Sequence, residues 1–227
     1  TNSGYPLTDF RNLTNPIIDV RSPLEFSQGH WPGAINIPLF SDKERELIGK
    51  SYKKESRLKA IMNGLKVILP KAGKILEVIQ ETTNKQNDVT IALRIYCWRG
   101  GLRSRSFAWL ARTIGFRTYV LEGGYKSYRK WVLNQFEADL PIRLLGGKTG
   151  TGKTDLLNCI RSEAIHVINL EGIANHRGST FGALGLGNQP STQQFENILA
   201  ESINKFQESN SNEIWLEAES SNLGKCR

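Results

Sequence analysis

The sequence predicts an α/β fold in which two parallel-sheet domains follow one another. Short apolar runs, typical of buried strands, alternate along the chain with longer segments in which apolar residues recur at helical spacing. This alternation favours parallel sheets, because parallel strands are joined by crossovers that are usually helices. A polar stretch at 137–141 separates two such series. Within the 227 residues we therefore expect one domain at residues 1–137 and a second at residues 138–227.

The first domain opens with a strand, a capped helix and a second strand. Residues 15–20 form an apolar run that predicts a short buried strand. Ser22 then acts as a helix cap, with Pro23 at the first helical position and Glu25 three residues after the cap. Residues 35–38 alternate in polarity and end in proline, which favours a strand at the edge of the sheet.

Residues 43–82 predict a helical hairpin or a pair of helices inserted into this domain. Their apolar residues recur at steps of three and four, and Pro70 must break or kink the pattern. Between Lys43 and Lys74, ten Lys or Arg residues stand against three Glu, so this segment carries +7 of the chain's formal charge of +8. A basic surface of this kind favours a polyanionic partner, and nucleic acid is the first candidate.

The turn around Cys97 is the strongest functional signal of the first domain. The apolar run 89–96 predicts a strand that enters it, and periodic residues over 107–114 predict a helix that leaves it. A strand-to-helix turn directs backbone N–H groups at an anion and favours the thiolate form of a cysteine. The candidate catalytic residues are Cys97, Arg99 and Arg103, and the candidate anion-loop residues are Gly100, Gly101, Leu102 and Ser104.

Residues 118–121 predict one more strand, and 127–136 predict the helix that closes the domain. Together, the segments 19–26, 29–38, the Cys97 loop and 121–131 resemble a rhodanese domain, in which the cysteine carries a persulfide or a related chalcogen. The loop from Cys97 to Arg103 is a residue longer than in many sulfurtransferases. It resembles the loops of rhodanese-fold phosphatases and arsenate reductases, and we expect it to admit a tetrahedral anion the size of phosphate.

The second domain begins with a phosphate-binding motif. A predicted strand at 142–146 and a predicted helix at 155–160 flank a G-x-x-x-x-G-K-T sequence, in the strand–loop–helix context that a P-loop requires. Its N–H groups wrap a di- or triphosphate, and Lys153 bridges phosphate oxygens. The sequence leaves open whether Mg²⁺ binds as a cofactor, and Thr154 is the candidate ligand for it. The candidate phosphate-binding residues are Gly147, Lys148, Thr149, Gly150, Thr151, Gly152, Lys153 and Thr154.

Polar residues follow each of the next two predicted strands, at 164–170 and 213–218, which a helix at 194–206 separates. Ligand sites in parallel sheets lie beyond the carboxyl ends of the strands. The candidate substrate-binding residues are therefore His176, Arg177, Ser179, Glu217 and Glu219, with the choice between the two glutamates left open. Three strands are few for a sheet that must be covered on both faces, and we expect the domain to be truncated at the end of the chain.

Four segments of the chain, at 97–104, 146–154, 170–182 and 215–224, together resemble the tRNA 2-selenouridine synthase family. The resemblance implies a transferase that converts wobble 2-thiouridine of certain tRNAs to 2-selenouridine through an S-geranyl intermediate. Its implied substrates are geranyl diphosphate and selenophosphate, without NTP hydrolysis and without a firmly bound cofactor. Its implied partners are tRNA and an enzyme that supplies selenophosphate.

Composition indicates where such a protein works. The chain has no apolar run long enough to span a bilayer, and residues 1–10 lack the apolar core of a signal peptide. Its three cysteines are widely spaced and form no C-x-x-C pair, so neither a disulfide framework nor a zinc site is predicted. We therefore expect no membrane association and a cytoplasmic location.

Two other functions remain open at this point. The first is a rhodanese-fold phosphatase or arsenate reductase that uses Cys97 and Arg103. The second is a sulfurtransferase whose activity a nucleotide-binding P-loop module regulates. Hydrolysis of a generic aryl phosphate, or binding of nucleotide tighter than binding of geranyl diphosphate, distinguishes these alternatives from the tRNA-modifying transferase.

Overall fold

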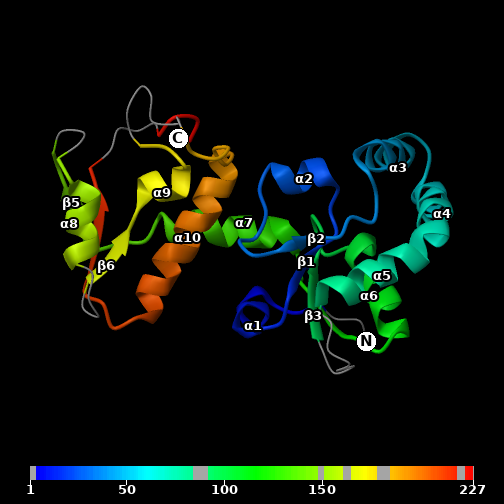
Figure 1. Ribbon diagram of the computed structural model, residues 1–227. Coiled ribbons are helices and arrows are strands. Elements are labelled where there is room, and N and C mark those ends of the chain that lie inside the picture. Colours follow the sequence, from blue (N-terminus) through cyan, green and yellow to red (C-terminus); the bar gives the residue numbers. More distant parts are fainter. Residues whose placement is uncertain are drawn as a thin grey trace. The chain divides into compact units, whose positions relative to one another are not determined.

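The computed structural model describes residues 4–83, 92–147, 151–160, 165–177, 185–218 and 223–226. The chain divides into two compact units, residues 1–128 and 129–227 (Figure 1). The division falls inside helix α7 (Gly124–Gln135). Within the described parts of the chain, no helix combines the length and the apolar character that crossing a bilayer requires.

The first unit is built on a four-stranded parallel sheet, as the sequence predicted, with strand order β2-β1-β3-β4. Ile18 pairs with Ile95 across the two inner strands, and Ile95 pairs with Val120. In strand β3, every residue except Arg94 is buried, because the rest of its sequence is apolar. The strands are β1 (Ile17–Asp19), β2 (Ile35–Asn36), β3 (Ala92–Tyr96) and β4 (Arg117–Val120).

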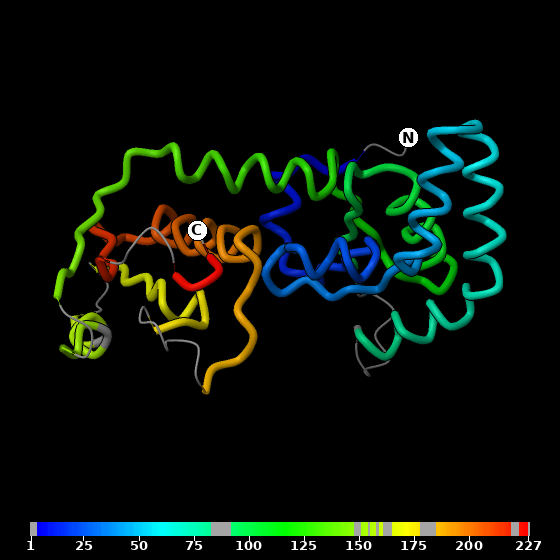
Figure 2. Tube along the Cα trace, turned by 90° about the horizontal axis from the view of Figure 1, so that it is seen from above, coloured from blue at the N-terminus to red at the C-terminus, as the bar shows by residue number. Residues whose placement is uncertain are grey.

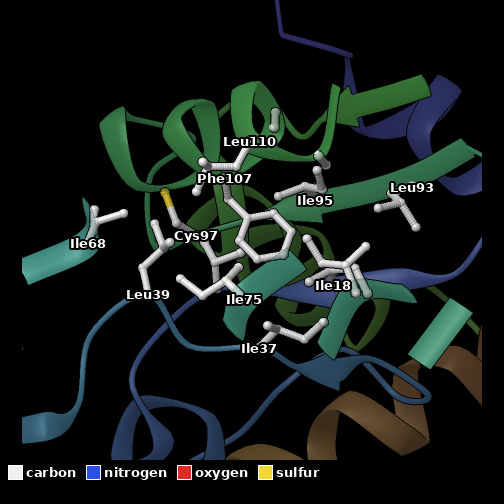
Figure 3. Close-up of a cluster of buried hydrophobic side chains, with 14 of the residues drawn as sticks. Ile18, Ile37, Leu39, Ile68, Ile75, Leu93, Ile95, Cys97, Phe107 and Leu110 are labelled. Carbon is white, nitrogen blue, oxygen red and sulfur yellow. The ribbon is translucent and has the colours of Figure 1, made fainter. Parts of the chain in front are cut away.

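Helices enclose this sheet and complete its core. The predicted start of α2 (Pro23–Ser27) is confirmed, because the Glu25 amide donates to Ser22 Oγ and the Ser22 amide donates to Glu25 Oε2. The largest cluster of buried side chains joins strand residues such as Ile18 and Ile95 to Phe107 of α6 (Figure 3). The other helices of the unit outside the insert are α1 (Leu7–Asn12), α6 (Leu102–Thr113) and the start of α7.

The insert contains three α-helices, so the predicted hairpin or pair is wrong by one helix. A second break that sequence analysis missed lies before Arg57, where Ser56 Oγ accepts a hydrogen bond from the Lys59 amide and caps a new helix. Pro70 breaks the pattern as predicted and lies in a 3-10 turn, η1 (Leu69–Lys71). The α-helices are α3 (Asp42–Lys54), α4 (Arg57–Ile68) and α5 (Ala72–Thr83), of which α3 and α4 lie side by side (Figure 2).

The second unit has a three-stranded parallel sheet with order β5-β7-β6 among the described residues. Its core packs Ile203 and Phe206 of a long helix against Ile168 and Ile214 of the sheet. Asn169 caps the short helix that follows β6, and Asn175 ends that helix with a φ of 49°. The elements are β5 (Ile142–Leu145), α8 (Lys153–Ile160), β6 (Ile165–Ile168), α9 (Leu170–Ala174), α10 (Thr192–Glu208) and β7 (Glu213–Glu217).

Candidate active site

Cys97 lies where the sequence predicted it, directly after β3 and before the start of α6. Its side chain is buried, and its Sγ is 3.3 Å from the hydroxyl of Ser104. The Ser104 hydroxyl also donates to the carbonyl of Gly101, the residue at the N-cap of α6. The turn therefore brings the cysteine, the two loop glycines and Ser104 together beside a helix N-terminus, an arrangement that suits a small anion.

The start of α7 binds the same loop through its backbone, an interaction that sequence analysis did not anticipate. The Tyr125 amide donates to the carbonyl of Cys97 at 2.8 Å, and the Lys126 amide donates to that of Trp98 at 3.0 Å. A helix normally leaves its first amides without partners inside the helix. Here the loop carbonyls accept from two of them, so α7 and the Cys97 loop hold each other in place.

Two glycines make this close approach feasible. Gly100 has a φ of +65°, and a Cβ there would lie 2.5 Å from the Leu121 carbonyl oxygen. Gly124 has a φ of +61°, and a Cβ there would lie 2.3 Å from the Cys97 carbonyl oxygen. Both positions combine a left-handed backbone with backbone atoms at close range, so no other residue fits without displacing the loop.

Arg103 is held by a carboxylate that sequence analysis assigned only to helix capping. Its guanidinium donates to Glu25 Oε2 at 2.6 Å and to Glu25 Oε1 at 3.3 Å. Burial opposes ionisation of Glu25, but the hydrogen bonds and charge of Arg103, the Ser22 amide and the charge of Arg45 outweigh it and lower the pKa of Glu25. Arg103 stays a candidate catalytic residue, and in this structure its guanidinium is paired with Glu25.

Arg99 lies at the exposed side of the loop. Among the residues that the structure describes, no carboxylate forms an ion pair with it. Its neighbour Trp98 is also partly exposed and lies near the Tyr125 ring. Of the two predicted arginines, Arg99 is therefore the one whose charge is available to a ligand.

A buried ion pair lies next to two tyrosines that flank the loop, Tyr96 and Tyr125. Asp19 and Arg21 are both buried, and Arg21 Nη2 donates to Asp19 Oδ2 at 2.6 Å. The Arg21 guanidinium lies 3.8 Å from the centre of the Tyr125 ring, which links the end of β1 to the start of α7. Burial, with the Asp19 charge added, raises the pKa of Tyr96 well above its usual value, so this tyrosine stays neutral. In the sequence, this segment indicated only the resemblance to a rhodanese domain.

The predicted strand–loop–helix context of the P-loop is confirmed where the structure describes it. β5 leads to Gly147, and α8 begins at Lys153. Lys153 Nζ donates to the Gly147 carbonyl at 2.9 Å, so the ammonium group lies over the start of the loop. Thr151 and Gly152 are exposed. Lys148, Thr149, Gly150 and the side chain of Thr154, with the Mg²⁺ site expected there, lie outside the described residues.

Glu217 lies at the carboxyl end of the central strand β7, beside the strand that carries the P-loop. It pairs in register with Leu145, and the Ala218 amide donates to the Leu145 carbonyl at 3.0 Å. The side chain of Glu217 is buried. Glu219 lies outside the described residues. Within those residues, no group of three or more His, Cys, Asp or Glu side chains is arranged to hold a metal ion.

The remaining predicted substrate residues follow α9. The His176 amide donates to the Glu171 carbonyl, and a Cβ added at Gly224 would lie 2.7 Å from His176 Cδ2. The His176 side chain therefore packs against the turn at 223–226. Arg177 is exposed, and Ser179 lies outside the described residues.

Comparison with known proteins assigns both parts of the chain. Residues 7–130 match the family model of the rhodanese-like domain, and residues 140–227 match that of the tRNA 2-selenouridine synthase AAA domain. The tRNA 2-selenouridine synthase of Shewanella denitrificans is 37% identical, over 99% of this chain and 61% of that protein. That of Sulfurovum sp. NBC37-1 is 40% identical, over 85% of this chain and 52% of that protein.

The chain thus spans about three-fifths or less of the length of these curated relatives. Among solved structures, it is similar to the N-terminal domain of a protein from Clostridium difficile 630 that is described as ATP/GTP binding. That similarity has a TM-score of 0.52 at 35% sequence identity and covers 58% of this chain and 99% of the solved one.

Proposed function

Because the chain belongs to the rhodanese-like family and, through its second domain and its relatives, to the tRNA 2-selenouridine synthases, we propose that it converts wobble 2-thiouridine in tRNA to 2-selenouridine. The observation that supports this most is that one chain carries two strand-to-helix turns with anion-binding sequences, one at Cys97 and one before Lys153. The Cys97 turn suits a single tetrahedral anion, whereas the P-loop after β5 suits a diphosphate. Two such sites match a reaction with two phosphorylated substrates.

The first proposed step is geranyl transfer at the P-loop. The sulfur of 2-thiouridine attacks the first carbon of geranyl diphosphate, the carbon–oxygen bond breaks, and pyrophosphate leaves with the electron pair while the thiouridine loses its N–H proton. Negative charge develops on the leaving group. Lys153 and the loop amides stabilise that charge, which is electrostatic catalysis by preorganised donors.

The second proposed step is selenium transfer at the Cys97 loop. The selenium of selenophosphate attacks carbon 2 of the base, and the carbon–sulfur bond breaks with its electron pair on the departing geranylthiolate. Water then cleaves the phosphorus–selenium bond and releases phosphate. The start of α6 and Arg99 hold the phosphate portion, and Cys97, whose Sγ lies 3.3 Å from the Ser104 hydroxyl, helps to position it in the turn.

The basic insert contributes to tRNA binding in this proposal. Six of its ten basic residues are exposed and form no ion pair within the described part of the chain, and phosphate binding of this kind does not depend on base sequence. They are Lys43, Lys53, Lys54, Arg57, Lys66 and Lys74. A tRNA substrate also implies that the protein acts in the cytoplasm, and the selenium step implies a partner enzyme that supplies selenophosphate.

Mass spectrometry of wobble nucleosides tests the function directly. Cells that lack the full-length protein should contain 2-thiouridine and no 2-selenouridine, and reintroducing the gene should restore the selenium nucleoside. Unchanged 2-selenouridine in its absence contradicts the proposal. Hydrolysis of an aryl phosphate that Cys97→Ser abolishes favours the rhodanese-fold phosphatase instead.

A further inference from the structure

An apolar pocket of about 140 Å³ lies in the first unit, between the insert and the start of α6. One wall comes from α3 and α4, through aliphatic residues that include Ile48, Ile61, Leu65 and Ile68. The other wall comes from the first turns of α6, through Leu102 and Arg103. The insert therefore does more than carry positive charge, because it completes an apolar pocket against the helix that begins at the Cys97 loop.

This pocket adjoins the candidate active site. Ile68 lines the pocket and belongs to the same buried cluster as Cys97, and the sulfur of Cys97 lies at the edge of that cluster in Figure 3. Leu102, on the opposite wall, follows directly after the anion-loop glycines. A molecule whose reacting atom lies at the Cys97 loop can thus extend an apolar group into this pocket.

The mouth of the pocket exposes apolar side chains to water. Tyr52, Leu65 and Leu102 keep 59%, 42% and 48% of their surface exposed. Such residues beside a reactive loop are characteristic of a ligand site rather than of a closed core. The one charged residue of the lining, Arg103, has its guanidinium paired with Glu25, so its charge does not oppose a hydrocarbon.

We propose that this pocket binds the terminal isoprene unit of the geranyl group on S-geranyl-2-thiouridine while the base lies at the Cys97 loop. An apolar cavity of about 150 Å³ lined by similar side chains holds a benzene molecule, so the space suffices for one isoprene unit. The inference rests on the proposed function, since it assigns a place to the chain that leaves in the selenium step. It predicts that the site selects the geranylated base over 2-thiouridine.

Filling the pocket tests the inference. Gly64 lines it from α4, and an added Cβ there would make ordinary contact with Phe40, at 3.5 Å. Gly64→Leu places a larger side chain in the space. Gly73→Leu is the matched control, because Gly73 lies in α5, outside the pocket, with no atom within 4 Å of an added Cβ. Both changes replace a helical glycine by a better helix former.

The measurement is the affinity of the chain for two synthetic anticodon stem-loops, one with S-geranyl-2-thiouridine and one with 2-thiouridine. The unmodified protein and Gly73→Leu should bind the geranylated RNA about tenfold tighter, since burying hydrocarbon strengthens binding. Gly64→Leu should bind both RNAs equally. Equal affinities in the unmodified protein, or a preference that survives in Gly64→Leu, overturns the inference.

A second pair of variants covers the case in which Gly64→Leu does not fold. Leu102→Gln changes the mouth of the pocket, and Leu133→Gln on α7 changes a leucine of similar exposure away from it. Only the first should reduce the preference. Turnover of the geranylated RNA with selenophosphate by the full-length protein separates the two proposals. Formation of 2-selenouridine without any geranyl preference refutes the pocket alone, and absence of product refutes the proposed function.

Discussion

Glu25 connects side chains that lie far apart in the sequence. It caps α2 through Ser22, binds Arg103 of α6, and has Arg45 of the insert 3.7 Å away. The side chains of Glu25 and Arg103 are only 20% and 18% exposed, so water screens their attraction less than at an open surface. One carboxylate thereby joins α2, the Cys97 loop and the insert.

Glu25→Gln should lower the free energy of unfolding by about 1–2 kcal/mol at pH 7, because it removes a charge-assisted hydrogen bond. The pKa of Glu25 is lowered in the folded state. Its contribution is therefore complete above the unfolded pKa of about 4.3 and is lost as the pH falls through the lower folded pKa. Urea unfolding of both proteins at pH 7 and at successively lower pH should show the difference shrinking.

Glu77→Gln, at an exposed position of α5, is the control for this series and should change stability little at any of these pH values. A loss at Glu25 that stays constant as the carboxylate becomes protonated contradicts the electrostatic explanation.

At the scale of elements, the start of α7 determines the shape of the Cys97 loop. Gly124→Ala forces a Cβ against the Cys97 carbonyl and should lower the free energy of unfolding by about 1–3 kcal/mol. Selenium transfer should fall as well, since the loop must move. Gly73→Ala, inside a helix with open space around it, should raise stability by up to about 1 kcal/mol. Urea denaturation and turnover assays of the two variants give the comparison.

Normal turnover in Gly124→Ala contradicts this account of the loop. A loss of activity that appears equally in Gly73→Ala points instead to a general effect of removing glycine.

The insert is the second element whose role is testable. Reversing Lys53, Lys54 and Lys66 to Glu should weaken tRNA binding and lower the slope of log K against log salt by about one unit for each phosphate that the variant no longer binds. The weakening should be similar for tRNAs of different sequence, because these lysines bind phosphates rather than bases. Affinity measured over a range of salt concentrations provides the slope.

Reversing Lys130, Lys205 and Lys225, which are exposed outside the insert, changes the net charge equally and serves as the control. An equal change of slope in both triple variants assigns the effect to total charge rather than to the insert.

At the scale of the whole molecule, the two anion sites should divide the two chemical steps. Lys153→Ala removes the ammonium group over the P-loop and should block geranylation, leaving 2-thiouridine. Cys97→Ala should leave geranylation intact and block selenium transfer, so S-geranyl-2-thiouridine should accumulate. Mass spectrometry of tRNA nucleosides from cells that carry each full-length variant distinguishes the two products.

Cys159→Ala, at an exposed cysteine of α8, is the control and should leave both nucleosides unchanged. Accumulation of 2-thiouridine alone in Cys97→Ala contradicts the separation, since both steps then depend on the rhodanese loop.

Sequence alone determined the features that depend on close neighbours in the chain. The capping box at Ser22, the strand-to-helix turn at Cys97, and the strand and helix on either side of the P-loop motif appear as predicted. Each rests on hydrogen bonds or steric limits within a few residues, which spacing reveals. The alternation of strands and helices also sufficed for the parallel α/β class. The spacing of apolar residues did not give the number of helices in the insert, because the second break lies at the Ser56 cap, which is a hydrogen-bonding signal rather than a hydropathy signal.

Tertiary structure alone decided how these features meet. Glu25 binds Arg103, which lies 78 positions further along the sequence. Gly124 packs against the carbonyl of Cys97, and no sequence pattern indicates this backbone contact. Glu217 lies beside the P-loop only because β7 pairs with β5, an order that hydropathy does not specify. The physical reason is that strand order, ion pairing and pocket shape arise when packing brings distant segments together, and the local spacing of residues does not reveal which distant segment packs against which.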